Sequence, residues 1–256
     1  MTESCCHLMI SPTDPGVVLV DKLPGKTSFS VVRAVRKIFG VKKVGHAGTL
    51  DPFASGLLVV CIGRPATRLI GQLMEGEKSY RATVVLGKTS TTQDPEGEIS
   101  DCGSLDGIDP DKIEAVLAGF RGKILQTPPH FSALKHKGKP LYHYARRGIK
   151  ITKEPRAVTI HELDLTEVDL ASDRSDPSME LLIRCSKGTY IRSLAEDIGR
   201  SLGCGAYLSA LRRTRSGCFS VEDCLPGGCL DDPEKTQWVR ERRIEVGEVQ
   251  KLLHYS

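Results

Sequence analysis

Residues 45–56 read Gly-His-Ala-Gly-Thr-Leu-Asp-Pro-Phe-Ala-Ser-Gly, and this stretch is the most informative part of the chain. It holds one carboxylate, Asp51, and the apolar run Leu57–Ile62 follows directly. The ring of Pro52 keeps Asp51 out of helical geometry, and the glycines on either side permit a close approach of other groups. An ordinary Asp-Pro turn is the simpler interpretation. Because a rigid turn beside a buried strand can also hold a catalytic acid, Asp51 is the first candidate for chemistry.

Four other stretches carry further motifs. They are Lys78-Ser79-Tyr80, the segment Gln126–Gly138 with its Gln-Thr-Pro-Pro start, Lys187-Gly188-Thr189-Tyr190-Ile191-Arg192, and Leu211-Arg212-Arg213. Together with residues 45–56 they resemble the TruB family of RNA pseudouridine synthases over roughly residues 17–220. One departure is visible, because the family favours Lys-Pro-x-Gly where this chain has Lys22-Leu23-Pro24-Gly25.

The resemblance implies both a fold and a reaction. The fold is α+β, with a mixed, largely antiparallel sheet, flanking helices and a basic inserted thumb. The reaction is isomerisation of uridine to pseudouridine in the T-arm loop of tRNA, at position 55, after the base has been flipped out. It implies no cofactor, no metal and no guide RNA, and we expect a monomer.

The resemblance also assigns residues to the site. Asp51 is the essential catalytic group, Arg192 pairs with it, and Tyr80 stacks on the target base. The other substrate-binding residues that it implies are Tyr190, Leu211, His46 and Lys22. The basic insertion supplies candidate RNA-binding residues, namely Lys135, Lys137, Lys139 and Arg147.

Each of these residues has a simpler interpretation when it is considered without the family. Tyr80 and Leu211 have the spacing of core residues, and Arg192 could be a surface arginine that ends a strand. His46 could be an ordinary histidine with satisfied hydrogen bonds. The family motifs favour the functional interpretation in each case.

A single carboxylate suits isomerisation better than hydrolysis. Breaking the glycosidic bond builds positive charge at C1′ of the ribose, and Asp51 could stabilise this charge, attack C1′ or remove the C2′ proton. Hydrolytic glycosidases normally need two carboxylates. Two routes stay open, a covalent sugar ester at Asp51 and a glycal formed through C2′.

The distribution of charge favours RNA as a partner. Seven Lys or Arg residues and no acid lie between Lys22 and Leu50, and nine and no acid lie between Arg121 and Lys153, in a chain with 32 acids. Phe131, Tyr142 and Tyr144 lie among the second group. A solvated basic face would explain one such run. Two runs with interleaved aromatic rings indicate contacts with phosphates and bases.

Hydrophobic periodicity predicts the elements that carry these residues. Ser28–Phe39 has a helical stripe, with Ser28 as its expected N-cap and Gly40 as its end. The other predicted elements are a helix from Pro65 to about Met74, a strand over residues 80–86, a helix that begins at Pro110 with Asp109 as its cap, a strand over Met179–Arg192 and a helix over Ser193–Leu202. Strands and helices do not alternate regularly, which favours an α+β domain.

We expect three regions in 256 residues. Residues 1–16 are predicted to be a flexible leader, 17–220 the catalytic domain with the insertion 121–153, and 221–256 a short C-terminal extension. Relatives in the family often end in an RNA-binding PUA domain, and about 36 residues are too few for a complete one. The extension is therefore either a reduced PUA domain or a helical addition.

Other classes of protein are less consistent with the sequence. No run of about eighteen apolar residues and no secretory n-region is present, so we expect a cytoplasmic protein without a membrane span. The spacings of His130, His136 and His143 match no usual metal site. Two rivals remain, a catalytic subunit of a guide-RNA-dependent ribonucleoprotein and an RNA-binding protein that has lost catalysis. A guide-dependent enzyme needs a docking platform for its RNA, for which the short C-terminal region offers little room.

Overall fold

The structure is a computed structural model that describes residues 14–149, 151–170 and 176–254. Most of its strands join one large sheet; they are β1 (Gly16–Lys22), β2 (Val44–Ala47), β3 (Ser55–Ile62), β4 (Lys78–Leu86), β7 (Gly122–Gln126), β10 (Arg156–Asp169), β11 (Ser178–Cys185), β12 (Ala206–Ser216), β13 (Phe219–Ser220), β14 (Leu225–Pro226) and β15 (Ile244–Glu245). Two small hairpins are β5 (Lys88–Ser90) with β6 (Ile99–Asp101), and β8 (Lys135–His136) with β9 (Lys139–Pro140).

The large sheet has eleven strands and runs in the order β14-β1-β3-β12-β4-β11-β10-β7, with β2, β13 and β15 paired at its side. Most neighbours are antiparallel, and β14 on β1 and β12 on β3 are the parallel pairs. The predicted mixed, largely antiparallel α+β fold is therefore confirmed. The strand β12 lies between β3 and β4, although β3 and β4 are close together in the sequence.

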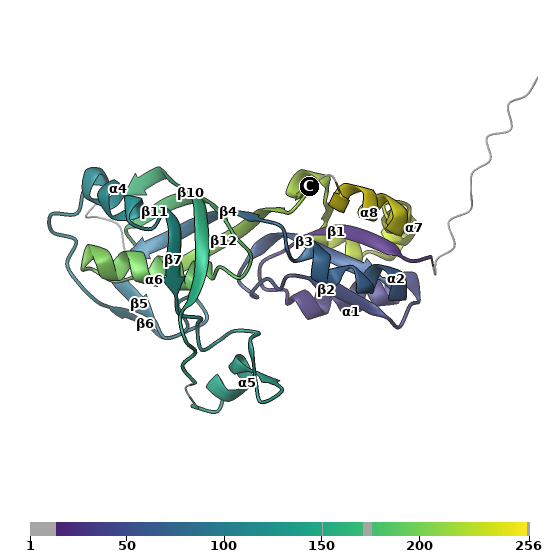
Figure 1. Cartoon of the computed structure of the whole chain (residues 1–256), viewed down its shortest axis with the longest axis horizontal. Helices are drawn as coiled ribbons and strands as arrows, with labels where there is room; N and C mark the ends of the chain where they lie inside the picture. Colours follow the sequence, from purple (N-terminus) through teal and green to yellow (C-terminus); the bar gives the residue numbers. More distant parts are fainter. Residues whose placement is uncertain (1–13, 150, 171–175, 255–256) are drawn as a thin grey trace, which may run out of the picture.

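Helices cover the sheet and build its loops. They are α1 (Ser28–Phe39), α2 (Gly63–Arg68), α3 (Ile70–Leu73), α4 (Pro110–Ala118), α5 (Leu141–Ala145), α6 (Ile191–Leu202), α7 (Thr236–Glu241) and α8 (Val246–His254), with short 3-10 helices η1 (Val221–Asp223), η2 (Gly227–Asp231) and η3 (Pro233–Lys235). Figure 1 shows α1, α2, α7 and α8 around the half of the sheet that holds β1 and β3, and α4 and α6 around the half that holds β10 and β11. None of the described helices is long and apolar enough to cross a membrane.

The strands β1 and β3 are apolar at nearly every position because both of their faces are buried. In β1, Val18 and Val20 pack into the main core with α1, whereas Val17 and Leu19 pack into a second core that includes Leu69 and Leu73. The β3 run alternates between the two cores in the same way. Burial on both faces thus fixes the strand that follows Asp51.

The segment after residue 220 is part of the same sheet. Its strands β14 and β15 both pair with β1. Val239 of α7 lies in the main core and Val249 of α8 lies in the second core. The segment therefore wraps around the β1 edge and covers both faces there.

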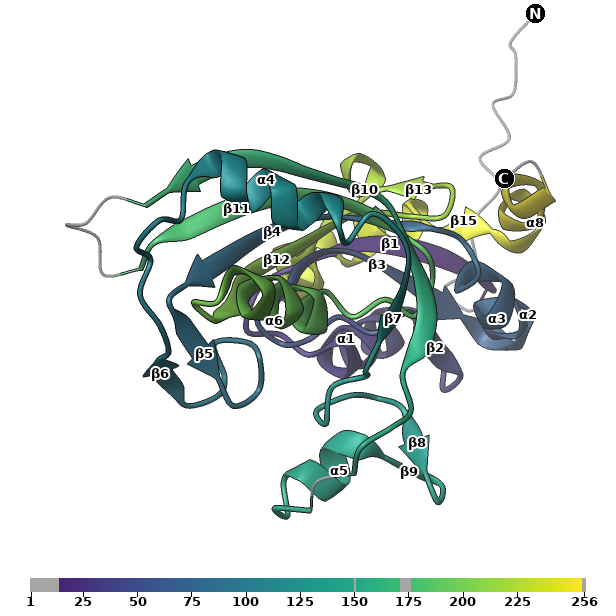
Figure 2. The same cartoon turned by 60° about the vertical axis from the view of Figure 1, so that its left-hand side comes forward.

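The basic insertion projects from the body as a separate lobe. Its first residues, 122–126, belong to β7 and pair with β10, so the projecting part is shorter than the predicted 121–153. We call residues 127–149 and 151–155 the thumb. Figures 1 and 2 show it below the sheet, where it carries α5 and the β8–β9 hairpin. The turn of this hairpin needs positive φ at Lys137 (48°) and Gly138 (81°).

Three predicted boundaries were wrong. The N-cap of α1 is Thr27, whose hydroxyl accepts a hydrogen bond from the Ser30 amide, and not Ser28. The predicted strand over Met179–Arg192 ends at Cys185, because a turn follows and Arg192 lies in the first turn of α6. The helix expected from Pro65 is two short helices that begin at Gly63 and Ile70. The predicted N-terminal leader falls largely outside the described residues.

Candidate active site

The loop that carries Asp51 is anchored on both sides. The buried hydroxyl of Ser28 accepts a hydrogen bond from the Leu50 amide (2.9 Å) and donates one to the Leu50 carbonyl (3.0 Å). On the other side, the carbonyl of Pro52 accepts hydrogen bonds from the Lys22 ammonium (3.1 Å) and the Gly25 amide (2.8 Å). The backbone of Asp51 is thus fixed by α1 and by the end of β1.

Arg192 pairs with Asp51 across the two halves of the sheet. Its Nε lies 2.9 Å from Oδ2 of Asp51, and its Nη1 lies 3.1 Å from Oδ2 of Asp94. The remaining donors reach the carbonyls of Thr92 (3.0 Å) and Phe131 (2.7 Å). The guanidinium is 4% exposed, so its orientation is determined entirely by these partners.

Asp94 is a second carboxylate that the sequence did not reveal. It is also 4% exposed, and it accepts hydrogen bonds from the Thr92 hydroxyl (2.5 Å) and the Glu96 amide (3.0 Å). The sequence Asp94-Pro95-Glu96-Gly97 indicates only a turn, so no local signal pointed to a site residue. The fold places this turn, at the tip of the β5–β6 hairpin, against Arg192.

Burial and charge act in opposite directions on Asp51. Burial raises the pKa of Asp51 above that of an exposed aspartate, and Arg192 opposes this rise. Lys22, farther away, opposes it as well. The pairing therefore favours the charged carboxylate in an environment that makes it a stronger base than a solvated one. About a third of the Asp51 side chain remains exposed, which leaves it accessible to a substrate.

Tyr80 is connected to the Asp51 loop through Arg213. Tyr80 on β4 lies opposite Arg213 on β12, and burial raises the pKa of Tyr80 while its hydrogen bond with Arg213 lowers it. Arg213, 2% exposed, also donates to the carbonyls of Leu57 (2.8 Å) and Gly48 (3.0 Å). The sequence singled out the Leu-Arg-Arg motif without giving Arg213 a role. One guanidinium thus positions both a candidate stacking ring and the Asp51 loop.

Tyr190 is held by Gln126 at the base of the thumb. The Gln126 amide group accepts a hydrogen bond from the Tyr190 amide (2.7 Å) and donates one to the Tyr190 carbonyl (2.9 Å). Burial raises the pKa of Tyr190, and Asp51 and Arg192 both lie close enough to influence it. This two-point contact explains why a buried glutamine begins the insertion.

His46 and Leu211 make no hydrogen bond or ion pair with Asp51 among the described residues. His46 is on β2, where burial and then the charge of Arg213 lower its pKa and favour the neutral ring. Its Nδ1 is buried and has no hydrogen-bond partner among the described residues. Leu211 on β12 is 8% exposed and belongs to the main core.

The four candidate thumb residues are apart from this cluster. Lys135, Lys137, Lys139 and Arg147 are all exposed, and none forms an ion pair with a described residue. Partial burial and then the charges of Arg147 and Lys139 lower the pKa of His143 on α5. The thumb thus presents unneutralised positive charge to solvent.

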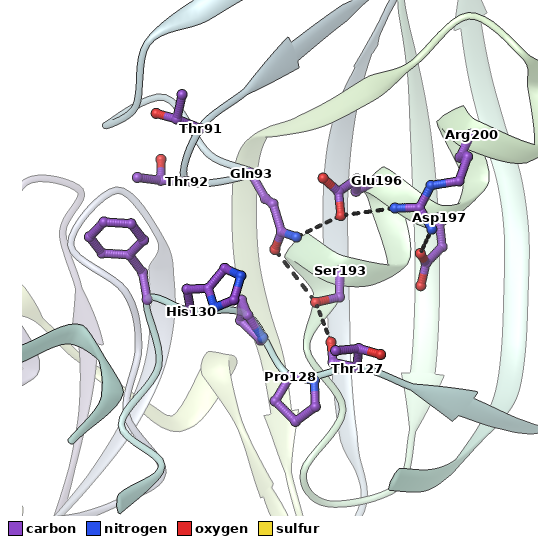
Figure 3. A pocket seen from close by; sticks show the side chains of 12 residues that line it. Thr91, Thr92, Gln93, Thr127, Pro128, His130, Ser193, Glu196, Asp197 and Arg200 are labelled. Carbon is purple, nitrogen blue, oxygen red and sulfur yellow. Dashed lines mark hydrogen bonds and ion pairs between the residues drawn. The ribbon is translucent and has the colours of Figure 1, made fainter. Parts of the chain in front are cut away.

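A polar cavity of about 330 Å³ lies beside the cluster, between the β5–β6 hairpin, the base of the thumb and α6 (Figure 3). Its walls are joined by hydrogen bonds from Gln93 to Glu196 (2.7 Å) and from Ser193 to the Thr127 carbonyl (3.1 Å). Asp51 does not line it. Arg192 separates the two, since it donates to the carbonyls of Thr92 and Phe131, which do line the cavity. The cavity wall therefore fixes the thumb base against α6.

The described residues include no group of three or more His, Cys, Asp or Glu side chains that could hold a metal ion. Lys22 is a buried cation beside the loop, and it donates to the carbonyls of Leu23 (3.0 Å), Lys26 (2.6 Å) and Pro52 (3.1 Å). These contacts indicate that Lys22 holds the loop in place.

The titration of Lys22 predicts a pH dependence of stability. Burial lowers its pKa from 10.5 to about 8, so between these values the native state binds fewer protons than the unfolded chain. The unfolding free energy therefore rises with pH in this window, and below it the buried charge reduces stability. Relative to Lys22→Met, we expect the wild-type unfolding free energy to rise by about 2 kcal/mol between pH 8 and pH 10.

Denaturant unfolding at the two pH values measures this difference. Lys26→Met is the matched control, since it removes a nearby lysine whose side chain is 52% exposed. If the unfolding free energies of the Lys22 and Lys26 variants change equally with pH, the pKa of Lys22 is not lowered in the native state.

Comparison with known proteins places these residues in context. Residues 36–191 match the family model "TruB family pseudouridylate synthase (N terminal domain)", and residues 192–233 match "tRNA pseudouridylate synthase B C-terminal domain". A protein of Desulfotalea psychrophila named tRNA pseudouridine synthase B is 52% identical, over 93% of this chain and 96% of its own length. A protein of Chlamydia pneumoniae with the same name is 47% identical, over 86% of this chain and 90% of its own length.

Solved structures show a similar fold. A chain in the "Crystal Structure of a Cbf5-Nop10-Gar1 Complex" is 30% identical with a TM-score of 0.69. The match covers 94% of the present chain and 63% of that chain, so the present chain spans less than two thirds of its length.

Proposed function

Because the chain belongs to the TruB family of pseudouridylate synthases, we propose that it isomerises uridine to pseudouridine in tRNA. Curated relatives that carry the name tRNA pseudouridine synthase B support this activity, and one of them is covered over 96% of its length. The observation that carries the proposal is the Asp51–Arg192 pair. An accessible carboxylate on an anchored turn meets a buried guanidinium at 2.9 Å within the matched region.

The reaction breaks the bond between C1′ and N1 of uridine, turns the base and joins C1′ to C5. The proton on C5 is lost and N1 ends with a proton, so atoms balance without a co-reactant. Asp51 responds to the positive charge that develops at C1′ in one of two ways. Its carboxylate forms an ester with C1′, or it removes the C2′ proton. Arg192 orients this carboxylate and keeps it charged.

The second carboxylate supports isomerisation and not hydrolysis. Asp94 is buried and occupied by Arg192, Thr92 and the Glu96 amide. It is therefore unable to activate water, which is the role of the second acid in an inverting glycosidase. Tyr80 and Tyr190 are proposed to contact the flipped uracil, and His46, Leu211 and Lys22 to shape and support the pocket.

We propose the T-arm loop, at position 55, as the target within tRNA. We also propose that the enzyme acts in the cytoplasm as a monomer without a guide RNA. The test is incubation of an unmodified tRNA transcript with the purified protein alone, followed by mapping of pseudouridine. Conversion of one T-loop uridine supports the proposal, and no conversion contradicts it.

The exposed thumb is proposed to bind phosphates. Replacing Lys135, Lys137, Lys139 and Arg147 with Ala should weaken tRNA binding and flatten its salt dependence. Removing a single cation that neutralises a phosphate lowers the slope of log affinity against log salt by about one unit. Binding measured across a salt series gives this slope.

The control for the thumb replaces exposed lysines on other elements, Lys112, Lys235 and Lys251. This variant should keep the wild-type slope. If thumb and control variants give superimposable curves, the thumb charges do not contact the RNA.

The arrangement of the C-terminal segment predicts a small footprint on tRNA. Residues 221–254 add to the β1 edge of the sheet, and we propose that α1, the thumb and the Asp51 site make the main contacts with the RNA. An isolated T-arm hairpin should therefore be modified with kcat/KM within about tenfold of that for full-length tRNA, which is about 1.4 kcal/mol. A loss beyond about a hundredfold, or about 2.7 kcal/mol, would mean that another surface reads the rest of the tRNA.

A further inference from the structure

Two aromatic side chains are exposed among the residues that the structure describes. Phe29, at the start of α1, is 59% exposed, and Tyr142, in the thumb helix α5, is 42% exposed. An exposed phenylalanine loses the free energy that burial of its ring would contribute, so its position invites an explanation. The proposed chemistry does not use Phe29.

Phe29 is held at a fixed place relative to Asp51. The neighbouring residue Ser28 is the one whose hydroxyl clamps both backbone groups of Leu50, and Leu50 precedes Asp51. Phe29 follows Ser28 and Asp51 follows Leu50, so the two hydrogen bonds between Ser28 and Leu50 lie one residue from each of them. The ring is therefore positioned by the same anchor as the catalytic loop.

The exposed face of α1 is positively charged. Phe29, Arg33, Arg36 and Lys37 have the spacing i, i+4, i+7 and i+8, which places them on one side of the helix. The helix contains no acid, and none of these three cations forms an ion pair with a described residue. Nε of Arg36 is buried without a hydrogen-bond partner among those residues. This face is suited to a polyanion.

Arginine backs the ring of Phe29. Cζ of Arg33 lies 5.7 Å from the centre of the ring, one helical turn along. The same i, i+4 pairing joins Tyr142 to Arg146 in the thumb, at 5.6 Å. Burial raises the pKa of Glu96, next to Asp94, and Arg146 is close enough to oppose this rise. Both views place α1 and α5 on the same, lower side of the sheet (Figures 1 and 2).

A third pair of an arginine and an aromatic ring, Arg242 and Trp238, has a structural role. Arg242 lies 4.4 Å from the ring of Trp238, but this ring is partly buried and packs against the main core. Its arginine covers a core residue. Phe29 has no such packing role, because its ring faces solvent.

We propose that Phe29 and Arg33 form a nucleotide-stacking platform that binds an unpaired base of the RNA next to the extruded uridine, while Arg36 and Lys37 bind the adjoining phosphates. This site rests on the proposed function, since it needs an RNA loop at Asp51. Single-stranded RNA is recognised by bases stacked on aromatic rings or guanidinium planes, with cations on the backbone. The α1 platform gives the RNA loop a second site of contact, in addition to the thumb.

The test uses a T-arm hairpin transcript and its equilibrium Kd for wild type and four variants. Phe29→Ala should weaken binding about tenfold, within the range measured for loss of one stacked base. Phe29→Tyr should bind within about twofold of wild type because it keeps the ring. Phe29→Leu should bind like Phe29→Ala, although it restores apolar bulk. Leu182→Ala is the control, since Leu182 is an exposed apolar residue of β11 and its loss should change nothing.

A second experiment identifies the stacked base. Hairpins with one abasic nucleotide at each loop position are bound to wild type and to Phe29→Ala. At the loop position whose base stacks on Phe29, the losses of binding free energy caused by the abasic nucleotide and by Phe29→Ala should not be additive. At every other loop position the two losses should be additive. Additivity at every position, or a Kd for Phe29→Ala within twofold of wild type, overturns the platform. If Phe29→Leu binds the hairpin as tightly as wild type, an apolar side chain is sufficient at this position. That result also overturns the stacking platform.

These outcomes are separate from those for the reaction. If wild type binds the hairpin and forms no pseudouridine, the proposed function fails while the platform can still be supported. If wild type converts uridine and Phe29→Ala binds normally, only the platform fails. If wild type does not bind the hairpin, both fail.

Discussion

Replacing Asp51 with Asn is expected to abolish pseudouridine formation while tRNA binding stays within about tenfold of wild type, or about 1.4 kcal/mol. Asn keeps the shape of the side chain but cannot attack C1′, accept the C2′ proton or balance the charge at the sugar. Loss of one such group typically costs about 10²–10⁴-fold for proton transfer alone, and loss of the charge adds to this. Single-turnover conversion of a tRNA transcript measures the rate.

The neighbouring acid gives a matched control for Asp51. Glu96 follows the Asp94 turn and lies close enough for Asp51 to raise its pKa, after the larger effects of burial and Asp94. Glu96→Gln removes a carboxylate from the same region, and its rate should stay within about tenfold of wild type, or about 1.4 kcal/mol. A near-normal rate for Asp51→Asn would end the assignment of Asp51 as the catalytic group.

Arg192→Gln is expected to reduce both stability and activity. The change leaves the Asp94 carboxylate, 4% exposed, without its cation, and removal of one partner from a buried ion pair costs about 3–5 kcal/mol. Activity should fall because Asp51 loses the group that orients it. Denaturant unfolding gives the free energy, and single-turnover kinetics gives the rate.

Arg200→Gln is the control on the same helix. Arg200 pairs with Glu196 and Asp197, but its side chain is 68% exposed, so its loss should cost at most about 1 kcal/mol. The double variant Arg192→Gln/Asp94→Asn should be more stable than Arg192→Gln because the charge of Asp94 is no longer left buried and unpaired. If Arg192→Gln unfolds like Arg200→Gln, Arg192 is not the buried connector that the structure indicates.

The sequence predicted those parts of the site that have local patterns. Asp51 on its Asp-Pro turn was evident, because the glycines and the following apolar run are contiguous in the chain. The helix of residues 28–39 was also evident, since its stripe of buried side chains has a 3.6-residue period. The N-cap was wrong by one residue because both Thr27 and Ser28 suit that position, and only the structure shows that the Ser28 hydroxyl is occupied by Leu50.

The unpredicted parts depend on contacts between distant segments. Asp94 reaches Arg192 only because the β5–β6 hairpin folds back onto α6, a contact between residues 98 positions apart. Arg213 reaches Gly48 across 165 positions. The boundary before Arg192 was missed because the predicted strand included the whole Lys-Gly-Thr-Tyr-Ile-Arg motif, although the strand ends at Cys185 and the helix begins at Ile191. Such contacts leave no local period in the sequence.

The place of β12 in the sheet also determines when the site can form. Asp51 precedes β3, and Arg192 lies in the first turn of α6, which packs against β12. The two halves of the sheet are joined by β12, which lies between β3 and β4 but is made more than a hundred residues after them. Pairings between such distant segments close large loops and are slow to form.

A ribosome that has translated as far as residue 205 has already made Asp51, Tyr80 and Arg192. The strand that holds them within reach of one another has not yet been made. The nascent chain therefore carries every proposed catalytic side chain without being a catalyst, and it becomes one only when β12 enters the gap between β3 and β4.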